Sequence, residues 1–399
     1  MIQIQRNLKK PLQQLKTSLL IFIILPILLT SCGKESISPV DSIATNEPQV
    51  ALSQTQTSST TSSTISGYDV TKSLPAGYVK DGSKDYTTYL QDAINKYTDI
   101  TFPAFPIMVN DKGLVVGSNK TLTFLAGSKL IVKPSSNGNY NIIDIVNASN
   151  VTLNSPVIVG DRYVHLGTSG EWGMGIGIYG SSKVTVNNAT ITNCWGDGIT
   201  VEPKKGVSSS AISINNAYCN YNRRNGMSIT SVIGMTVESS YFGHTNGVLP
   251  CAGIDIEPNS STDELQQVTI SNTRTEYNTG TGISTGLKNL FGGSNKKMSL
   301  TVINHIDKGS ADAFRATATL TRRVGSETVS GDIIVTNPYW RQNTNTPIQT
   351  NILVKTIKLT VTKPTVQDVN GNQLNNASIL ALFTYKTNIN RDANYVITF

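Results

Sequence analysis

The sequence predicts an all-β fold, a right-handed parallel β-helix of about nine to ten coils with an N-terminal capping helix. A short phrase, glycine-apolar-variable-apolar, begins at Gly175, Gly198, Gly226, Gly253 and Gly282, at steps of 23, 28, 27 and 29 residues. Short β-type runs at such a period are typical of solenoids, in which each coil buries its apolar face only by stacking on its neighbours.

A second phrase, Thr or Ser followed by an apolar residue and an Asn-like residue, runs in phase with the first. Its central apolar residues are Phe124, Leu153, Val186, Ile214, Val237, Ile270, Val302, Val335 and Val361, nine marks over 237 residues. A β-propeller is the alternative, but its blades need four strands in about 40–50 residues. The shorter steps favour the β-helix.

The first 31 residues are predicted to be a lipoprotein signal peptide rather than part of the fold. Basic residues precede an apolar run at 19–29, and Leu-Thr-Ser leads into Cys32. The run is too short for the ~20 residues of a spanning helix. The ending resembles a bacterial lipoprotein signal, in which Cys32 becomes the lipidated first residue. We therefore expect a membrane-anchored protein of the cell envelope, on its periplasmic or its cell-surface face.

Composition divides the remaining chain into three parts. Residues 32–66 are rich in Ser, Thr and Gln and predict a flexible tether. Residues 67–296 hold the repeats and the N-terminal cap, which we expect as a short helix within 81–97, with one apolar face and Ser83 or Asp85 at its start. Residues 297–399 keep strand character without the glycine phrase, so they are either the last coils or a C-terminal β cap.

Charge and cysteine content narrow the ligand classes. Removing the signal, with its four basic and no acidic residues, lowers the formal net charge from +7 to +3. This mild basicity suits an acidic polysaccharide. It gives no indication of nucleic acid, because no basic run is interleaved with aromatic residues. The sequence has no Cys-x-x-Cys and only three scattered histidines, so no metal site is predicted.

Two segments carry a family resemblance. Asp-Gly at 81–82, Asp85 and QDAIN at 91–95 resemble the N-terminal cap of the pectate-lyase-like β-helix superfamily, and NCWGDGI at 193–199 resembles its coil motif. The resemblance covers about 78–290. It implies a right-handed parallel β-helix that acts on polysaccharides as lyase, glycosidase or epimerase, or that only binds them. The polygalacturonase motifs Asp-Asp, Gly-His-Gly and Arg-x-Lys are missing, as is the epimerase motif Asp-Pro-His-Glu.

Stacking of the glycine phrase predicts where catalytic carboxylates meet. With its apolar residues inward, Glu202 and Glu257 stack two coils apart, about 9–10 Å at the backbone. Asp255 lies on the same face, roughly 7 Å from Glu257. Inverting glycosidases separate their acid and base by about 6.5–9.5 Å. We predict Asp255, Glu257, Glu202 and Arg224 as the catalytic group, with Asp255 as general acid because Ile254 and Ile256 flank it.

The neighbouring turns and the polar insertion at 160–174 are predicted to bind the substrate. An indole beside charged groups suits the apolar face of a sugar ring. The residues expected to bind substrate are Arg223, Trp172, Glu171, Asp161, Arg162, His165 and Asp197.

Three functions remain open from sequence. In hydrolysis, one of the carboxylates stays protonated and another activates water. In β-elimination, acidic residues hold Ca²⁺, and the resemblance to lyases implies that Arg223 or Arg224 takes the proton; calcium is expected only in that case. The third is a non-catalytic, glycan-binding or adhesive rod. The partners expected are a polysaccharide or oligosaccharide and, through the lipid, a membrane.

The lipid anchor is testable by changing its acceptor. Cys32→Ala should release the protein from the membrane fraction or leave it unprocessed, because no thiol remains to carry the lipid. Detergent partitioning and the mass of the mature N-terminus measure this. Unchanged processing and partitioning would rule out the anchor.

Overall fold

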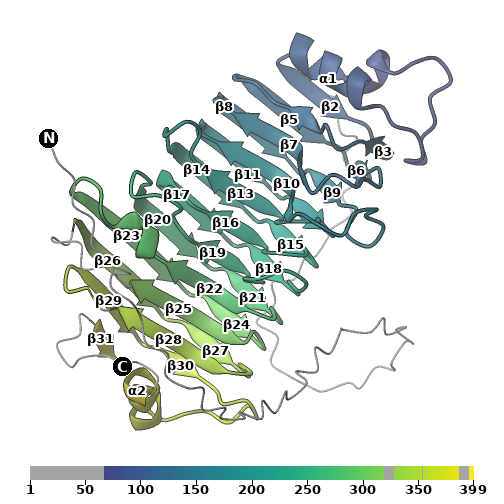
Figure 1. Cartoon of the computed structure of the whole chain (residues 1–399). Helices are drawn as coiled ribbons and strands as arrows, with labels where there is room; N and C mark the ends of the chain where they lie inside the picture. The colour runs from purple at the N-terminus through teal and green to yellow at the C-terminus, as the bar shows by residue number, and fades with distance from the viewer. Residues whose placement is uncertain (1–66, 319–327, 353, 386–394) are drawn as a thin grey trace, which may run out of the picture. The chain divides into compact units, whose positions relative to one another are not determined.

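The computed structural model describes residues 67–318, 328–352, 354–385 and 395–399. Within them the chain winds into a parallel β-helix of about nine turns (Figure 1), which confirms the predicted fold class. The predicted signal, tether and Cys32 lie outside the described residues. Among the described residues, no helix has the length and apolarity needed to cross a membrane.

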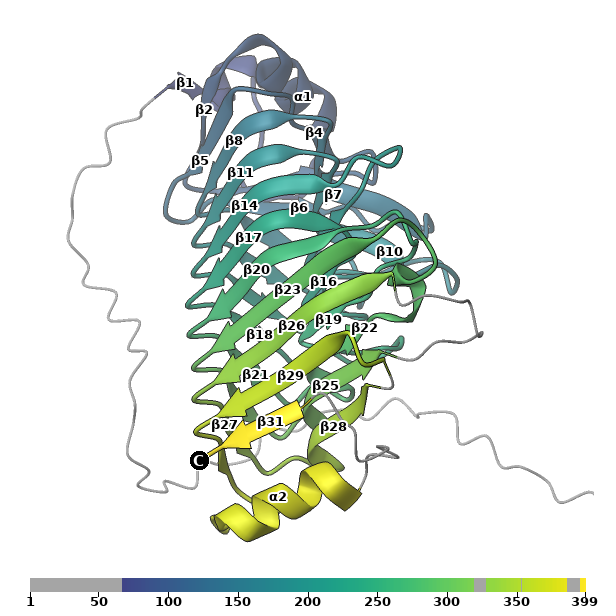
Figure 2. The ribbon, with the colours of Figure 1, turned by 90° about the vertical axis from the view of Figure 1, so that its left-hand side faces the viewer.

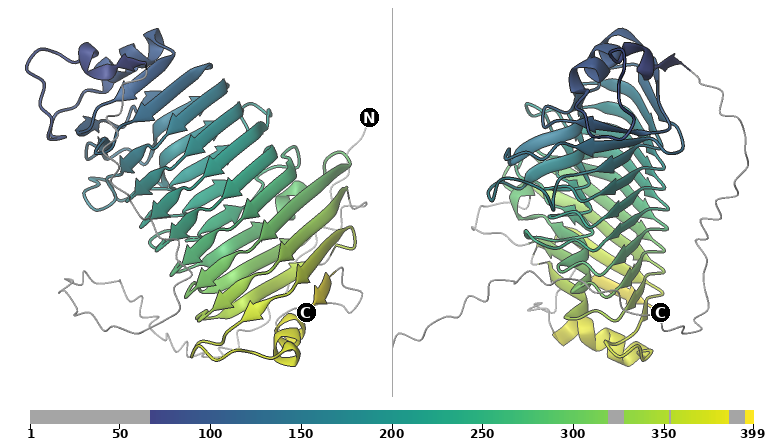
Figure 3. Two further views of the ribbon diagram at one scale, coloured as in Figure 1. Left: turned by 180° about the vertical axis from the view of Figure 1, so that it is seen from behind. Right: turned by 90° about the vertical axis from the view of Figure 1, so that its right-hand side faces the viewer.

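Each turn contributes one strand to each of three parallel sheets, which we number 1 to 3 in the order the chain visits them (Figures 2 and 3). Sheet 1 consists, in the described residues, of β1 (Tyr68–Asp69), β2 (Asp99–Phe102), β5 (Lys120–Phe124), β8 (Ser149–Asn154), β11 (Ser182–Asn187), β14 (Ser209–Asn215), β17 (Val232–Glu238), β20 (Leu265–Ser271), β23 (Lys296–Ile303), β26 (Val329–Thr336), β29 (Ile357–Thr362) and β31 (Tyr395–Thr398).

Sheet 2 is built of shorter strands, and sheet 3 carries the glycine phrase. Sheet 2 consists of β3 (Pro106–Val109), β6 (Lys129–Val132), β9 (Val157–Val159), β12 (Thr190–Thr192), β15 (Tyr218–Asn220), β18 (Tyr241–Gly243), β21 (Arg274–Glu276), β24 (Ile306–Lys308), β27 (Tyr339–Arg341) and β30 (Thr365–Val366). Sheet 3 consists of β4 (Leu114–Val115), β7 (Asn139–Val146), β10 (Trp172–Tyr179), β13 (Ile199–Glu202), β16 (Met227–Ile229), β19 (Ile254–Ile256), β22 (Thr281–Gly286), β25 (Asp312–Ala318) and β28 (Thr346–Ile352).

The glycine phrases stack in register along sheet 3. The first apolar residue of each phrase pairs with that of the next, in the column Ile176, Ile199, Met227, Ile254 and Ile283. A shift of one residue would exchange the inward and outward faces, so this register fixes which side chains enter the core.

The second repeat also forms one column in sheet 1, with one displacement. Eight of its marks, from Leu153 to Val361, pair in succession. The position predicted for the ninth mark, Phe124, is wrong, because Leu122 is the residue that pairs with Leu153. Residues two apart in a strand share a face, so the apolar pattern alone does not distinguish these two registers.

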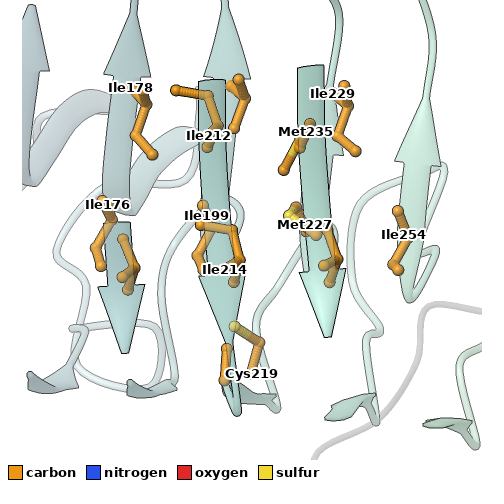
Figure 4. Close-up of a cluster of buried hydrophobic side chains, with 14 of the residues drawn as sticks. Ile176, Ile178, Ile199, Ile212, Ile214, Cys219, Met227, Ile229, Met235 and Ile254 are labelled. Carbon is orange, nitrogen blue, oxygen red and sulfur yellow. The ribbon is translucent and has the colours of Figure 1, made fainter. Parts of the chain in front are cut away.

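Apolar side chains from the sheets meet inside the coils. Figure 4 shows members of this core from sheets 1 and 3, among them Ile199, Ile214, Met227 and Met235, all at most 1% exposed. Between sheets 1 and 2 the chain turns through a left-handed residue, Asn188 in one coil and Asn216 in the next, both at φ 53°. Asn tolerates this conformation, and the Asn216 side chain donates a 2.8 Å hydrogen bond to that of Asn188.

Helices lie at both ends of the described stack (Figure 1). The 3-10 helix η1 (Val70–Ser73) precedes α1 (Thr87–Lys96), which packs on β4 and buries Leu90 and Ile94. The helix lies within the predicted segment 81–97, and Asp85, one of the two residues predicted at its start, accepts the backbone N–H of Thr87 at 3.0 Å. After the short η2 (Lys288–Leu290), coils continue through β30, and α2 (Asn376–Tyr385) follows them.

The register predicts opposite outcomes at two adjacent positions of β17. Met235 is 1% exposed, whereas Thr236 is exposed. Met235→Asp should prevent soluble folding, because an unpaired charge in the core costs several kcal/mol. Thr236→Asp should stay within about 0.5 kcal/mol of wild type. Soluble yield and thermal melting compare the two, and equal behaviour would mean that the strand faces are assigned wrongly.

Candidate functional site

Part of sheet 3 is buried on both of its faces. The residues that alternate with the core column, Thr200, Ser228 and Asp255, are 0%, 4% and 4% exposed. They form one outward column of neighbouring strands. Outward side chains of a β-helix usually meet solvent, so this shielding marks the middle of sheet 3 as different from the rest of the surface.

A groove of about 620 Å³ runs over these strands. It extends from β7 to β19, four strand steps or about 19 Å. We call this feature the groove. Its lining residues are Asn139, Asn141, Asp144, Glu171, Trp172, Met174, Tyr179, Glu202, Lys204, Arg224, Ser228, Thr230, Asp255, Glu257 and Asn259. The four residues predicted as catalytic therefore share one groove with Trp172 and Glu171.

Asp255 is the most perturbed carboxyl group of the groove. Burial, followed by the charge of nearby Glu257, raises the pKa of Asp255 to about 7, against the lowering effect of Arg224. The sequence argument expected this direction because Ile254 and Ile256 flank the residue. A carboxyl group with a pKa near neutrality can hold a proton at pH 7 and donate it.

Glu202 and Glu257 occupy a second outward column, on either side of Thr230. The backbone N–H of Glu257 donates a hydrogen bond to the backbone carbonyl of Ile229. This bond continues the pairing of β16 and β19 to the residue just after β19. The fully buried Thr200 donates a 2.9 Å hydrogen bond to Glu202. Glu202 is therefore oriented by its own strand, while Glu257 directly follows the strand that holds Asp255.

Two carboxylates hold Arg224 in the groove, those of Asp197 and Glu171. The buried Asp197 accepts hydrogen bonds from Arg224 Nη1 at 3.0 Å and from Ser228 Oγ at 2.6 Å. Glu171 lies 3.9 Å from Arg224 Nε. Burial alone lowers the pKa of Arg224, but the surrounding carboxylates, Asp197 foremost, outweigh it and raise the pKa. Asp197, predicted to bind substrate, instead positions Arg224 from the interior.

The insertion at 160–174 also contributes less to the groove than its sequence indicated. Asp161 is fully buried, accepts a hydrogen bond from Tyr140, and bonds His165 Nδ1 at 2.8 Å. Arg162 donates to the backbone carbonyls of Tyr221 and Asn246, each at 2.6 Å. These contacts fasten the insertion to the coils. Asp161, Arg162 and His165 are not among the residues that line the groove.

The tandem arginines divide between two environments. Arg224 enters the groove, whereas Arg223 stacks on Trp195, with its Cζ atom 3.6 Å from the ring centroid. The His165 ring stacks on the same indole at 3.8 Å. Arg223 also donates to the carbonyl of Gly170 at 2.9 Å. It serves packing of the insertion and does not line the groove.

Several groove residues were not found from sequence. Asp144 pairs with Gly177 and so belongs to the outward column that contains Asp255. Its strand reads Ile143-Asp144-Ile145, the same apolar-acid-apolar order as Ile254-Asp255-Ile256, but no glycine precedes it. That order was the available signal. Asn139 and Asn141 lie on β7, which carries no glycine phrase. Tyr179 at the end of β10 and Lys204 just after β13 follow a glycine phrase but were not predicted as site residues.

The groove is acidic, although the chain as a whole is basic. Five carboxyl groups line it against two cations, Lys204 and Arg224. The expected acidic substrate does not fit this charge. Within the described ranges there is also no group of three or more His, Cys, Asp or Glu side chains arranged to hold a metal ion.

Comparisons with known proteins identify relatives without an assigned activity. No protein-family model matches the sequence. The uncharacterized protein YclG of Bacillus subtilis (strain 168) is 29% identical over 214 residues, covering 45% of this chain and 36% of its own length. The SPbeta prophage-derived uncharacterized protein YorA of the same strain is 27% identical over 187 residues, covering 42% and 32%. The chain thus spans about a third of these relatives.

Solved structures show the same fold at low identity. The pre-mature gene product 12 of bacteriophage phi29 superposes with a TM-score of 0.54 and 13% identity, over 75% of this chain and 50% of that one. The Streptococcus pneumoniae surface protein and adhesin PfbA gives 0.51 and 11%, over 84% and 100%. These likenesses show the architecture, and with the observed coils they establish that the chain is a parallel β-helix protein.

Proposed function

We propose that the protein hydrolyses a polysaccharide in the groove, with Asp255 as the general acid. One observation carries the proposal: a carboxyl group 4% exposed, with its pKa raised to about 7, lies in a groove beside a second carboxylate. General acids of glycosidases need this property, because they must hold a proton at the working pH until the leaving oxygen takes it.

Glu257 is proposed as the general base that activates water. It follows Asp255 by two residues on the same face, roughly 7 Å away at the backbone. Inverting enzymes hold their two carboxyl groups about 6.5–9.5 Å apart with room for a water molecule between them, and side chains that start from this backbone spacing can adopt such a separation. The sugar's anomeric carbon would lie between the two groups, so the reaction would invert its configuration.

Arg224 and Trp172 support this chemistry in different ways. Arg224 is fixed by Asp197 and lowers the pKa of Asp255, so it limits how far that pKa rises. Trp172 is 47% exposed at the groove and presents an apolar surface for a sugar ring. An aromatic platform next to carboxylates and amides is typical of sites that bind sugars by their apolar and hydroxyl faces.

Elimination is less well supported by the same residues. A base must lose its proton, but the pKa of Arg224 is raised, and Arg223 lies against Trp195 outside the groove lining.

We also propose that the lipid on Cys32, the residue after the predicted signal, anchors the protein to a membrane of the cell envelope, where it meets extracellular glycans. Both proposals are tested separately.

The hydrolysis proposal is tested with the full-length chain on a panel of plant, algal and host polysaccharides. Reducing ends should appear without the absorbance of unsaturated sugars. Asp255→Asn should lower kcat by about 10²- to 10⁴-fold, the usual contribution of a general acid. Activity should also fall as pH rises through about 7, because Asp255 then loses its proton.

Glu238→Gln is the matched control, because Glu238 lies on β17 in sheet 1, away from the groove. It should retain wild-type turnover. Unsaturated products would indicate a lyase, and binding without any product would indicate a glycan-binding protein. Full turnover by Asp255→Asn would remove Asp255 from the mechanism.

Asp255→Asn should also change how the stability of the fold depends on pH. A carboxyl group whose pKa is raised by folding stabilises the protein below its unfolded pKa of about 3.9, and this contribution disappears as pH rises to about 7. Asn has no proton to lose, so Asp255→Asn should melt at an increasingly higher temperature than wild type between pH 4 and pH 8.

For Glu238→Gln, the melting-temperature difference from wild type should change with pH in the opposite direction. Burial raises the pKa of Glu238, but hydrogen bonds from Ser271 and Asn272 outweigh burial and lower it. Its carboxylate therefore stabilises the fold at higher pH, and Gln should lose that contribution. A melting difference between Asp255→Asn and wild type that stays constant with pH would contradict the raised pKa.

A further inference from the structure

Both cations of the groove have other side chains near their charge, although Arg224 Nε has no hydrogen-bond partner among the described residues. Arg224 contacts Asp197 and Glu171. The Nζ atom of Lys204 lies 5.5 Å from the centroid of the Tyr179 ring, and its charge lowers the pKa of Asp144, although burial raises that pKa overall. A uronate or sulfate group entering the groove would have to compete with these partners while facing five carboxyl groups. Charge therefore favours a substrate without anionic groups.

Thr230 and Arg224 are the groove-lining residues of the described chain that each hold a buried polar atom without a hydrogen-bond partner, Oγ1 and Nε respectively, and Thr230 is the uncharged one. It lies in the column between Glu202 and Glu257, in the coil that separates them, and is 7% exposed. Its backbone N–H bonds to Val201 at 2.9 Å, but its Oγ1 atom has no hydrogen-bond partner among the described residues. A buried hydroxyl without a partner costs free energy, and here it lines the groove.

A sugar hydroxyl matches this position chemically. It can accept a hydrogen bond from the Thr230 hydroxyl and donate its own proton to a carboxylate oxygen of Glu202 or Glu257. A carboxylate-bearing sugar would bring a further negative charge between two glutamates. A neutral hydroxyl satisfies the unpaired group without that repulsion.

We propose that the groove binds an uncharged glycan, and that Thr230 is a specificity-determining residue that hydrogen-bonds a hydroxyl group of the sugar between Glu202 and Glu257. The inference rests on the function proposed above, because it takes the groove to be the glycan site. It adds the substrate class and a binding residue that the repeats did not indicate.

Thr230→Val tests the residue, because it removes the hydroxyl and keeps the branched shape. Affinity for the glycan should fall about tenfold, the worth of one hydrogen bond. The melting temperature of the free protein should stay equal or rise, because no hydrogen bond is lost and an unpaired polar group is removed. Binding is measured by titration calorimetry in the Asp255→Asn background, so that turnover does not interfere.

Thr273→Val is the matched control. Thr273 is 1% exposed and its Oγ1 also has no partner among the described residues, but it does not line the groove. Thr273→Val should share the equal or raised melting temperature and leave affinity unchanged. If Thr230→Val binds as tightly as wild type, or melts lower while Thr273→Val does not, Thr230 is structural and its assignment is overturned.

The substrate class is tested with glucan, mannan and xylan against polygalacturonate and alginate, each at low and high salt. A neutral glycan should bind, with little dependence on salt. Tighter binding of a uronate polymer would overturn the inference, and its cleavage would still leave hydrolysis standing. Binding of a neutral glycan without cleavage would refute hydrolysis alone. Failure of all five polymers to bind would overturn both.

Discussion

The parallel register between successive coils is the constraint on which the rest of the structure depends. Ile199, Met227 and Ile254 pair in one column. This pairing also decides which face of the sheet each remaining side chain of their strands occupies. Coils repeat at about 4.8 Å, so a residue's chemistry is set by the residues directly above and below it. Because a slip by one residue would bring Asp255 into the core in place of Ile254, burial of the apolar column also fixes the acidic one.

The site arises where this regular stack is covered. Most outward columns meet solvent, but the one holding Thr200, Ser228 and Asp255 is buried, so its polar groups depend on one another. Asp197 holds Arg224 and Ser228 from the interior, and Arg224 in turn acts on the pKa of Asp255. The proposed catalytic proton thus depends on electrostatic interactions that run from Asp197 through Arg224 to Asp255, across two coil steps.

The sequence was sufficient for the groups that belong to the repeats. Glu202, Asp255 and Glu257 lie on strands marked by the glycine phrase, so counting residues placed them on one face, and Arg224 comes from the turn just before such a strand. The fold class was predicted from the same repeats. The register error at Phe124 arose because residues two apart share a face, and only pairing selects Leu122.

Sequence reasoning was less successful where long-range packing decides a side chain's partner. Asp161, His165 and Arg223 have the composition of a binding loop, but Tyr140 and Trp195, from other coils, hold them in place. Local sequence carries no information about such partners. The same limit hid Asp144, whose strand lacks the glycine marker, and Thr230, whose significance lies in a hydrogen bond it does not make.

The central claim is that Asp255 holds a proton near neutral pH, and a direct titration of this carboxyl group tests it most closely. Infrared difference spectra between wild type and Asp255→Asn isolate the carbonyl band of the protonated side chain as pH rises. A band is expected at pH 5 that disappears around pH 7. A band lost near pH 4, the ordinary range of an aspartate, would contradict it.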